Sequence, residues 1–292
     1  MAAGYVAKKV LKKCGIEVCA YIKELASVRC PDIAHNQAFK YTNDYKKMRR
    51  ELDPFYQEIY VKGRITMEMR LLEKMKILAE IEKEIDVIRG KAPKLKPAAI
   101  QDKYEVHPVL NCPDIDSAKK MVEACNKITK TGDSSGGVVE VVVTGVPTGL
   151  GEPVFHKLDA ELGRMLGIGA VKGVEVGAGF RARDMTGSQS NDQMRSEDGK
   201  VIFESNNAGG ITGGLSTGQP IIIRLTVKPT PTIDKPQKTI DKYTLENKEL
   251  AAITRRDATI VGRIWPVAEN YTAILILDNL ITHYGYQTLK TK

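Results

Sequence analysis

GVVEVVVTGV at residues 137–146 and PIIIRLTV at residues 220–227 decide the fold class of this chain. Both are β-branched runs of strand length bounded by glycine or proline, which is typical of buried strands. Helical stretches lie between and after them, EPVFHKLDAELGRMLG at 152–167 and VAENYTAILILDNLITHYG at 267–285. Because strands and helices alternate irregularly, the pattern favours an α+β fold over a doubly wound parallel sheet.

The chain begins with helical spacing and then changes to strand alternation. Val6, Val10 and Leu11 recur at helical intervals, and GIEVCAYI at 15–22 alternates after its glycine. We therefore expect a helix followed by a strand before about Val28.

Residues 31–105 differ from the rest in their dense charge, and we interpret them as a helical insertion within a domain that spans 1–292. Leu71, Leu78 and Ile85 fall seven apart over barely three heptads, which end at Gly90. A surface helix packed on its own domain and a helical arm for association both fit this spacing.

The composition is that of a soluble globular protein with an attraction for anions. Of 292 residues, 42% are apolar and 27% are charged, and the net charge is +8. The basic residues are interleaved with 36 acids and aromatics are only 6%, so nucleic acid is a weak candidate partner. The apolar run at 273–277 is too short to span a bilayer. We expect neither a nucleic-acid nor a membrane partner, but a site for several negative charges.

The cysteines and histidines indicate neither a metal site nor a nucleophile. There are five cysteines, with no CxxC and no zinc-module spacing, which predicts buried free thiols in a reducing cytoplasm and no metal. GDSSGG at 132–137 is similar to a serine-protease nucleophile loop, but it falls at a helix-to-strand turn and no histidine shows a partner pattern. We reject that reading.

Three segments carry features of an anion site. SNNAGGITGGLSTGQP at 205–220 holds two glycine pairs, which fit either a backbone cradle for an anion or a mobile hairpin. KPTPT at 228–232 places a lysine and two hydroxyls at a strand end, which suits a phosphate or a polar ring edge. RRDATIVGR at 255–263 holds an acid among cations, which is either a solvated pair or a carboxylate kept ionised in a cleft.

Taken in order, six segments resemble the chorismate synthase family. They are GDSSGGVVEVVVTGVPTGLGEPVFHKLDAELG, GIGAVKGVEVGAGF, GSQSNDQM, FESNNAGGITGGLSTGQPI, VKPTPTI and RRDATIVGRIWPVAE. The similarity extends from about Val106 to the end, and residues 2–22 match the helix and strand that precede the insertion.

The resemblance implies an αββα sandwich with internal duplication, assembled as a homotetramer. It implies a cytoplasmic lyase that binds reduced FMN and converts 5-enolpyruvylshikimate 3-phosphate to chorismate by 1,4-elimination of phosphate, in the shikimate pathway of aromatic amino acid biosynthesis. In bifunctional members an NADPH-dependent step reduces the flavin.

The resemblance also implies site residues. The family's proton-transfer aspartate falls on Asp257. Its flavin contacts fall on Gly169, Ala170, Gly213, Lys228, Pro229, Thr230, Pro231, Thr232 and Arg255.

The chain departs from the family pattern in several places. Asn207 stands where many members have histidine, and Arg256 and Ala258 are unusual beside Asp257. The Gly-Glu-Ser-His-Gly and Ser-Ser-Ala-Arg motifs of the family's N-terminal third are absent, so we expect a fold incomplete at the N-terminus and little activity of the chain alone. A degenerate, non-catalytic subunit that assembles with a partner chain through the insertion helix is the alternative. A basic RNA-binding module is a weaker third reading.

Overall fold

The computed structural model describes residues 1–61, 103–107, 109–250 and 257–285, with the side chains of 53–61 left aside. The chain divides into two compact units. The first comprises Met1–Glu24, Gly136–Lys228 and Val261–Lys292, and the second Leu25–Ser135 and Pro229–Ile260.

The elements of the first unit are α1 (Ala2–Lys13), β1 (Glu17–Leu25), β3 (Gly137–Thr144), α6 (Leu158–Gly163), η1 (Arg164–Gly167), β4 (Val171–Val176), η2 (Gly179–Asp184), α7 (Gly187–Ser190), β5 (Met194–Glu197), β6 (Lys200–Phe203), β7 (Ile211–Thr212), β8 (Leu215–Ser216), β9 (Ile221–Val227) and α8 (Val261–Tyr284). Those of the second unit are β2 (Val28–Arg29), α2 (His35–Val61), α5 (Ile115–Lys130), β10 (Gln237–Ile240) and β11 (Asn247–Leu250).

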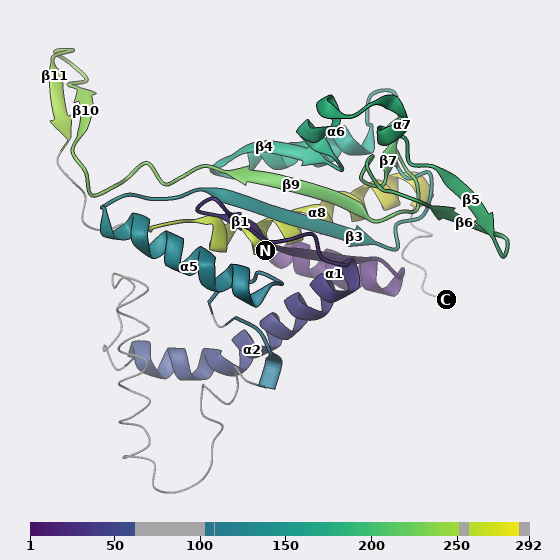
Figure 1. Ribbon diagram of the computed structural model, residues 1–292, viewed down its shortest axis with the longest axis horizontal. Helices are drawn as coiled ribbons and strands as arrows, with labels where there is room; N and C mark the ends of the chain where they lie inside the picture. Colours follow the sequence, from purple (N-terminus) through teal and green to yellow (C-terminus); the bar gives the residue numbers. More distant parts are fainter. Residues whose placement is uncertain (62–102, 108, 251–256, 286–292) are drawn as a thin grey trace, which may run out of the picture. The chain divides into compact units, whose positions relative to one another are not determined.

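The first unit is built on a sheet in which the strands follow the order β1-β3-β9-β4 (Figure 1). β9 pairs antiparallel with both of its neighbours. Val139, Val141 and Val143 lie opposite Leu225, Ile223 and Ile221, and all six side chains are fully buried. This alternation gives the sheet one apolar face, as the β-branched runs predict.

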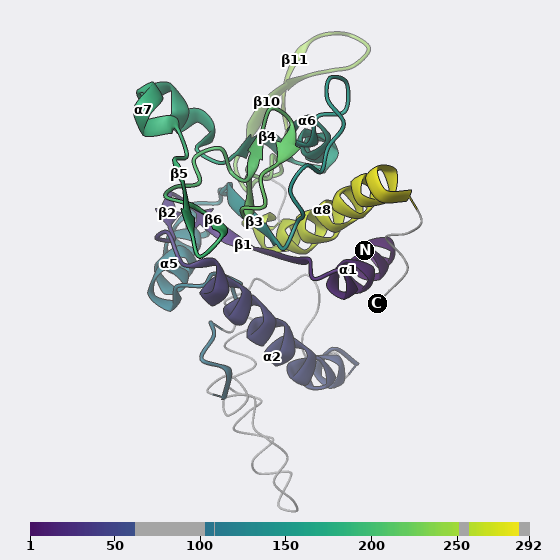
Figure 2. The same cartoon turned by 90° about the vertical axis from the view of Figure 1, so that its right-hand side faces the viewer.

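α8 packs on β3 and on α1, and the two helices lie beside one another in both views of the ribbon (Figures 1 and 2). Ala273, Ile276 and Leu280 of α8 are buried. The helices approach closely at Gly4, where a Cβ would lie 2.3 Å from the Asn270 Cβ. Any larger residue at position 4 would push α1 away from α8.

The other face of the sheet carries a buried polar ladder. Glu140 of β3, Arg224 of β9 and Glu175 of β4 are direct cross-strand neighbours. The Arg224 Nε donates to Glu140 Oε2 at 2.6 Å, and its Nη1 donates to the Gly177 carbonyl at 2.6 Å. Tyr21 of β1 donates its hydroxyl to Glu140. Because a one-residue slip would turn these groups to the apolar face, the ladder fixes the register of the strands.

In the second unit, local capping and buried tyrosines organise the described helices. The Asp114 carboxylate accepts the Ser117 N–H at 2.7 Å and so caps the start of α5. Tyr41 of α2 accepts the His107 N–H at 2.8 Å. The His107 Nδ1 accepts the Leu110 N–H at 3.1 Å, and burial lowers the pKa of this histidine. A neutral ring is the form that accepts such a bond.

Most of the sequence predictions for regular elements are confirmed. The first helix and strand are α1 and β1, the two β-branched runs are β3 and β9, and 267–285 lies largely within α8, which ends at Tyr284. The expected helix at 152–167 begins only at Leu158, because Glu152 and His156 pair as an isolated β-bridge. The mixed α+β class is therefore correct.

The predictions for the cysteines and for residues 31–105 are confirmed only in part or lie outside the described residues. Cys14 is exposed, so the expectation of buried thiols is wrong for it, since it follows the last turn of α1 on the surface; the other four cysteines are buried. Within 31–105 the structure shows α2, whereas the heptads at 71–88 lie outside the described residues. Over the part of the chain that is described, no helix has the length and apolar character needed to cross a membrane.

We predict that Glu140→Ala lowers the free energy of unfolding by about 3–5 kcal/mol, because it leaves the guanidinium of Arg224 buried without its main partner. Both side chains are buried, at 10% and 6% exposure. The measurement is urea unfolding followed by circular dichroism. Glu197→Ala, which breaks an exposed pair with Arg195, is the control and should cost less than about 1 kcal/mol. Equal losses in the two variants would contradict the prediction.

Candidate anion-binding site

Gly169, Ala170 and Lys228 meet at one corner of the sheet in the first unit. Val171 at the start of β4 pairs with Val227 at the end of β9. The residues just outside this pair therefore adjoin, and the Lys228 N–H donates to the Ala170 carbonyl at 3.0 Å. Ala170 has a φ of 70°, a left-handed conformation that few residues other than glycine adopt. Gly169 and Lys228 are exposed beside this turn, so a lysine charge and open backbone are available to a ligand.

Residues 228–232, the Lys-Pro turn, begin in the first unit with Lys228 and continue into the second unit. There, the hydroxyl of Thr230 has no hydrogen-bond partner among the described residues. Ser134 Oγ donates to the Thr230 carbonyl at 2.6 Å and fixes the backbone of the turn. The Thr230 Oγ1 is buried, and among the described residues it has no hydrogen-bond partner. An unpaired buried hydroxyl is unfavourable in a folded protein, so the Thr230 Oγ1 is a candidate donor or acceptor for a ligand.

Asp257 is anchored to the same loop as Thr230. Ser135, next to Ser134, donates its N–H to the carbonyl of Ala258 at 2.8 Å. Asp257 itself is half-buried and lies outside regular structure. The GDSSGG segment, rejected as a nucleophile loop, thus holds both the Lys-Pro turn and the segment of the candidate catalytic aspartate. Arg255 lies outside the described residues.

A charged contact stiffens this loop. Asp133 Oδ2 accepts from Lys235 Nζ at 2.6 Å, and the Gly132 carbonyl accepts the Asp234 N–H at 2.8 Å. Both contacts join the 132–135 loop to the residues that follow the Lys-Pro turn. Sequence reasoning missed this role because the partners lie about a hundred positions apart.

In the first unit, the glycine-rich segment, residues 205–220, binds an anion of the protein itself, the carboxylate of Asp192. Asp192 Oδ1 accepts from the Asn207 N–H and from Ser205 Oγ, each at 2.6 Å, and its Oδ2 accepts from the Ala208 N–H at 2.8 Å. The segment 205–208 is therefore the backbone cradle that the sequence suggests, with the Asp192 carboxylate in it. That the anion is a side chain of the same protein was not predictable from the composition of the segment.

Asn207 is also held from its carbonyl side. Its oxygen accepts the Ala178 N–H at 2.6 Å. Gly177 has a φ of 60°, and a Cβ there would lie 2.1 Å from this same oxygen, so the close approach requires glycine. The cradle is thus clamped between Asp192 and the end of β4.

Gly213 lies at the exposed tip of the β7–β8 hairpin, away from Ala170. The neighbouring Gly214 accepts the Leu158 N–H at 2.9 Å, which places the tip at the start of α6. Gly169 follows the end of η1, at the opposite end of the α6–η1 stretch. The described contacts therefore join Ala170 to Lys228, and Thr230 to the segment of Asp257, but they do not place Gly213 beside either pair.

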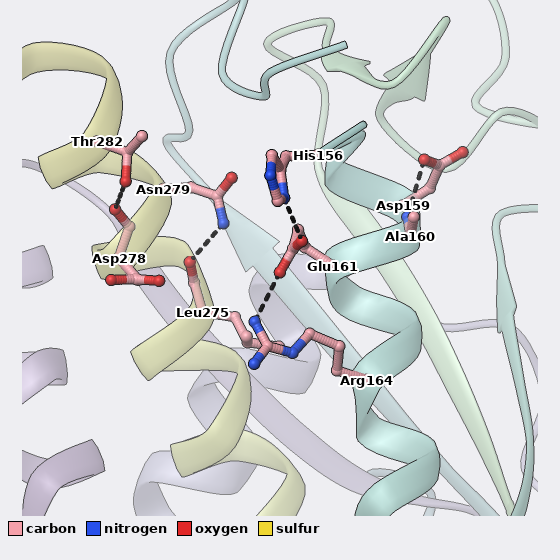
Figure 3. Close-up of polar contacts among 9 residues, drawn as sticks. All are labelled: His156, Asp159, Ala160, Glu161, Arg164, Leu275, Asp278, Asn279 and Thr282. Carbon is pink, nitrogen blue, oxygen red and sulfur yellow. Dashed lines mark hydrogen bonds and ion pairs between the residues drawn. The ribbon is translucent and has the colours of Figure 1, made fainter. Parts of the chain in front are cut away.

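A second polar group lies between α6 and α8 (Figure 3). Glu161 Oε1 and Oε2 contact His156 Nδ1 at 3.1 Å and Arg164 Nη1 at 2.8 Å. The Arg164 guanidinium and then His156 hold the pKa of Glu161 below its ordinary value. Because the His156 and Arg164 side chains are mostly exposed, this group is a surface tie for the loop ahead of α6 rather than a reaction centre.

These features define an α+β protein with an exposed lysine beside a left-handed turn in its first unit and, in its second unit, a buried hydroxyl that has no partner among the described residues. The sequence model of the family described as chorismate synthase matches residues 1–281. This chain belongs to the chorismate synthase family.

Individual relatives agree with the family match. Chorismate synthases of Methanosarcina mazei and Acetivibrio thermocellus are 50% identical over 199 and 185 residues, which is 68% and 62% of this chain but 54% and 47% of theirs. That of Thermococcus gammatolerans is 33% identical over 286 residues, 98% of this chain and 62% of its own. The chain thus spans about half the length of the first two relatives.

A solved structure supports the fold. A chain described as "Crystal Structure of Chorismate Synthase" superposes with a TM-score of 0.58 at 22% identity, covering 99% of this chain and 64% of that one. At this identity the match shows a shared fold.

We predict that the contribution of Asp192 to stability is lost in acid. Burial raises the pKa of Asp192, but hydrogen bonds from Ser205, Ala208 and Asn207 outweigh it and hold the pKa below its ordinary value. A carboxyl whose pKa is lowered by folding stabilises the protein above its unfolded pKa, and that stabilisation disappears as the pH falls through the folded pKa.

The measurement is the Tm of the wild type and of Asp192→Asn by circular dichroism between pH 6 and pH 2. The Tm difference between the two proteins should be full above about pH 4 and should shrink as the pH falls further. A difference that does not change with pH would contradict an ionised Asp192.

Proposed function

We propose that this chain takes part in the chorismate synthase reaction, the 1,4-elimination of phosphate from 5-enolpyruvylshikimate 3-phosphate that gives chorismate for aromatic amino acid biosynthesis. The family match over residues 1–281 carries this proposal. Its support within the fold is that the segments of Thr230 and Asp257 are anchored on one loop. A binding turn and a candidate proton-transfer group held by the same loop fit one reaction centre.

Reduced FMN is the proposed cofactor, and the residues present fit it. Lys228 is exposed and offers its charge to a phosphate, while the unsatisfied Thr230 Oγ1 offers a donor or acceptor. Gly169, Ala170, Gly213 and Arg255, with Pro229, Pro231 and Thr232, are the other proposed flavin contacts. When bound, FMN supplies electron density to the reacting ring.

Asp257 is the proposed proton-transfer residue of this chain. The Asp257 carboxyl group, on the segment that the 132–135 loop anchors, can exchange a proton at its Oδ atoms, and the exposed Lys228 offers a positive charge to the anionic ligand.

The finer attributes of the family are proposed with this function. They are an αββα sandwich with internal duplication, a homotetramer, a cytoplasmic location and, in the bifunctional case, flavin reduction by NADPH. The 31–105 insertion stays a predicted helical element within the domain, and neither nucleic acid nor a membrane is a proposed partner.

A non-catalytic subunit is the second candidate function. It is the alternative that the departures from the family pattern leave open, such as Asn207 and Arg256. Such a subunit would assemble with a partner chain through the insertion helix.

An anaerobic assay tests the two candidates. Chorismate formation from 5-enolpyruvylshikimate 3-phosphate with reduced FMN is measured for the chain alone, and for a fusion that adds the part of the Methanosarcina mazei relative outside its 199 matched residues. We expect product from the fusion and little or none from the chain alone. A fusion that folds but forms no chorismate would refute the enzymatic proposal and leave the subunit.

In the active fusion, Asp257→Asn should lower kcat by about a hundredfold or more with little change in KM, because it removes a proton-transfer group and keeps the shape. Asp116→Asn, at an exposed position in the first turn of α5, is the matched control and should turn over normally. An unchanged kcat for Asp257→Asn would exclude that aspartate from proton transfer.

Thr230→Val should weaken FMN binding by about fivefold while leaving the free energy of unfolding unchanged or higher. The hydroxyl makes no hydrogen bond to the described residues, so its removal costs the folded protein nothing, but it removes about 1 kcal/mol of bonding to a ligand. Flavin fluorescence titration and urea unfolding are the measurements. Thr226→Val, an exposed threonine on β9, is the control. Equal FMN affinity in both variants would remove Thr230 from the flavin site.

A further inference from the structure

The carboxylate of Asp192 occupies the position in the glycine-rich segment that a bound anion would take. It receives three hydrogen bonds of 2.6–2.8 Å, two from consecutive backbone N–H groups and one from the Ser205 hydroxyl. Consecutive N–H groups that converge on one anion are the geometry that proteins use for phosphates and carboxylates.

The segment that delivers Asp192 is itself fixed. α7 opens with a capping box between Thr186 and Gln189, and the Gln189 carbonyl accepts from Asn207 Nδ2 at 3.0 Å. Gln193 accepts the Glu204 N–H at 2.9 Å. Residues 189–193 and 204–208 therefore run together, with the Asp192 carboxylate at the centre of their contacts.

The cradle forms the base of the β7–β8 hairpin. Asn206 Nδ2 donates to the Pro220 carbonyl at 2.8 Å, and Gln219 Nε2 donates to the Ser205 carbonyl at 2.7 Å. The Thr217 N–H donates to the Gly210 carbonyl at 2.9 Å. The two ends of the hairpin are thus tied to each other, and one of them is tied to Asp192.

Gly213 lies at the exposed tip of this hairpin, three residues beyond the glycine pair Gly209–Gly210. Both glycines of the pair have a positive φ, so the backbone between the cradle and the tip has many alternatives to its native path. Fixing residues 205–208 at the base of the hairpin restricts this backbone to its native conformation.

We propose that Asp192 is a positioning residue for the flavin site: an internal anion that fills the Ser205–Ala208 cradle and thereby holds the Gly213 tip in its binding conformation. This role rests on the proposed function for its ligand, FMN. Asp192 acts through the backbone and makes no contact with the reacting atoms.

Removing the carboxylate and replacing it with a small soluble anion tests the role. FMN affinity is measured by fluorescence titration for the 292-residue chain and for Asp192→Ala, with and without 100 mM formate. Sodium chloride at equal ionic strength is the salt control. Asp184→Asn, a mostly exposed aspartate that pairs only locally with Arg183, is the matched variant.

Asp192→Ala should bind FMN about tenfold more weakly, as expected if the hairpin keeps its native conformation about a tenth of the time. Formate should restore most of the affinity because it can occupy the emptied cradle, whereas chloride should not. Asp184→Asn should match the wild type. An Asp192→Ala affinity equal to the wild type, or a loss that formate leaves unchanged, would overturn the positioning role.

Two further measurements keep the test decisive. If Asp192→Ala does not fold, Asp192→Asn takes its place, since it keeps the shape and loses the charge. Amide hydrogen exchange of residues 207–213 is followed in parallel and does not depend on flavin.

If the wild-type chain binds no FMN, the proposed function fails for this chain. Faster exchange in the variant, reversed by formate, would still support the anchoring of the hairpin, and unchanged exchange would overturn it.

Discussion

The buried guanidinium of Arg224 is the interaction on which the geometry of the first unit depends. It joins β3, β9 and β4 in one register by binding Glu140, Glu175 and the Gly177 carbonyl. Once β4 is fixed, so are the two turns at its ends, Ala170 beside Lys228 and Gly177 against the glycine-rich segment. Ala170 and Gly177 flank the strand and are separated by about 23 Å at 3.3 Å per residue. One ion pair therefore sets the spacing of two parts of the candidate site.

The regular elements were predictable because their signals are local. β3 and β9 are β-branched runs between glycine or proline, and α1 has helical spacing, so neighbours in the sequence determine the outcome. The bridge between Glu152 and His156 was not predictable, since their segment has helical composition and only the fold brings the two backbones together. The glycine-rich segment was half predictable: its composition indicated an anion cradle, but the anion is Asp192, fifteen positions before Asn207.

The candidate site shows the same division between local and distant information. The Lys-Pro turn and Asp257 were identified from motifs, whereas their common support, the 132–135 loop, was set aside as a simple turn. Nothing in GDSSGG indicates a partner a hundred residues away, because a hydrogen bond such as Ser134 to the Thr230 carbonyl depends on how the chain returns. A motif can reveal which residues meet a ligand, while the residues that hold them in place emerge only from packing.

The left-handed backbone at Ala170 restricts which residues can replace it during evolution. Its left-handed backbone is tolerated by glycine, asparagine and aspartate, and by alanine at a modest energetic penalty. A valine, isoleucine or threonine arising there by mutation would strain the main chain at the point where the Lys228 amide docks. Only a few small or polar residues are therefore tolerated at position 170. Purifying selection should act on this position through its backbone conformation, because the alanine side chain carries no functional group.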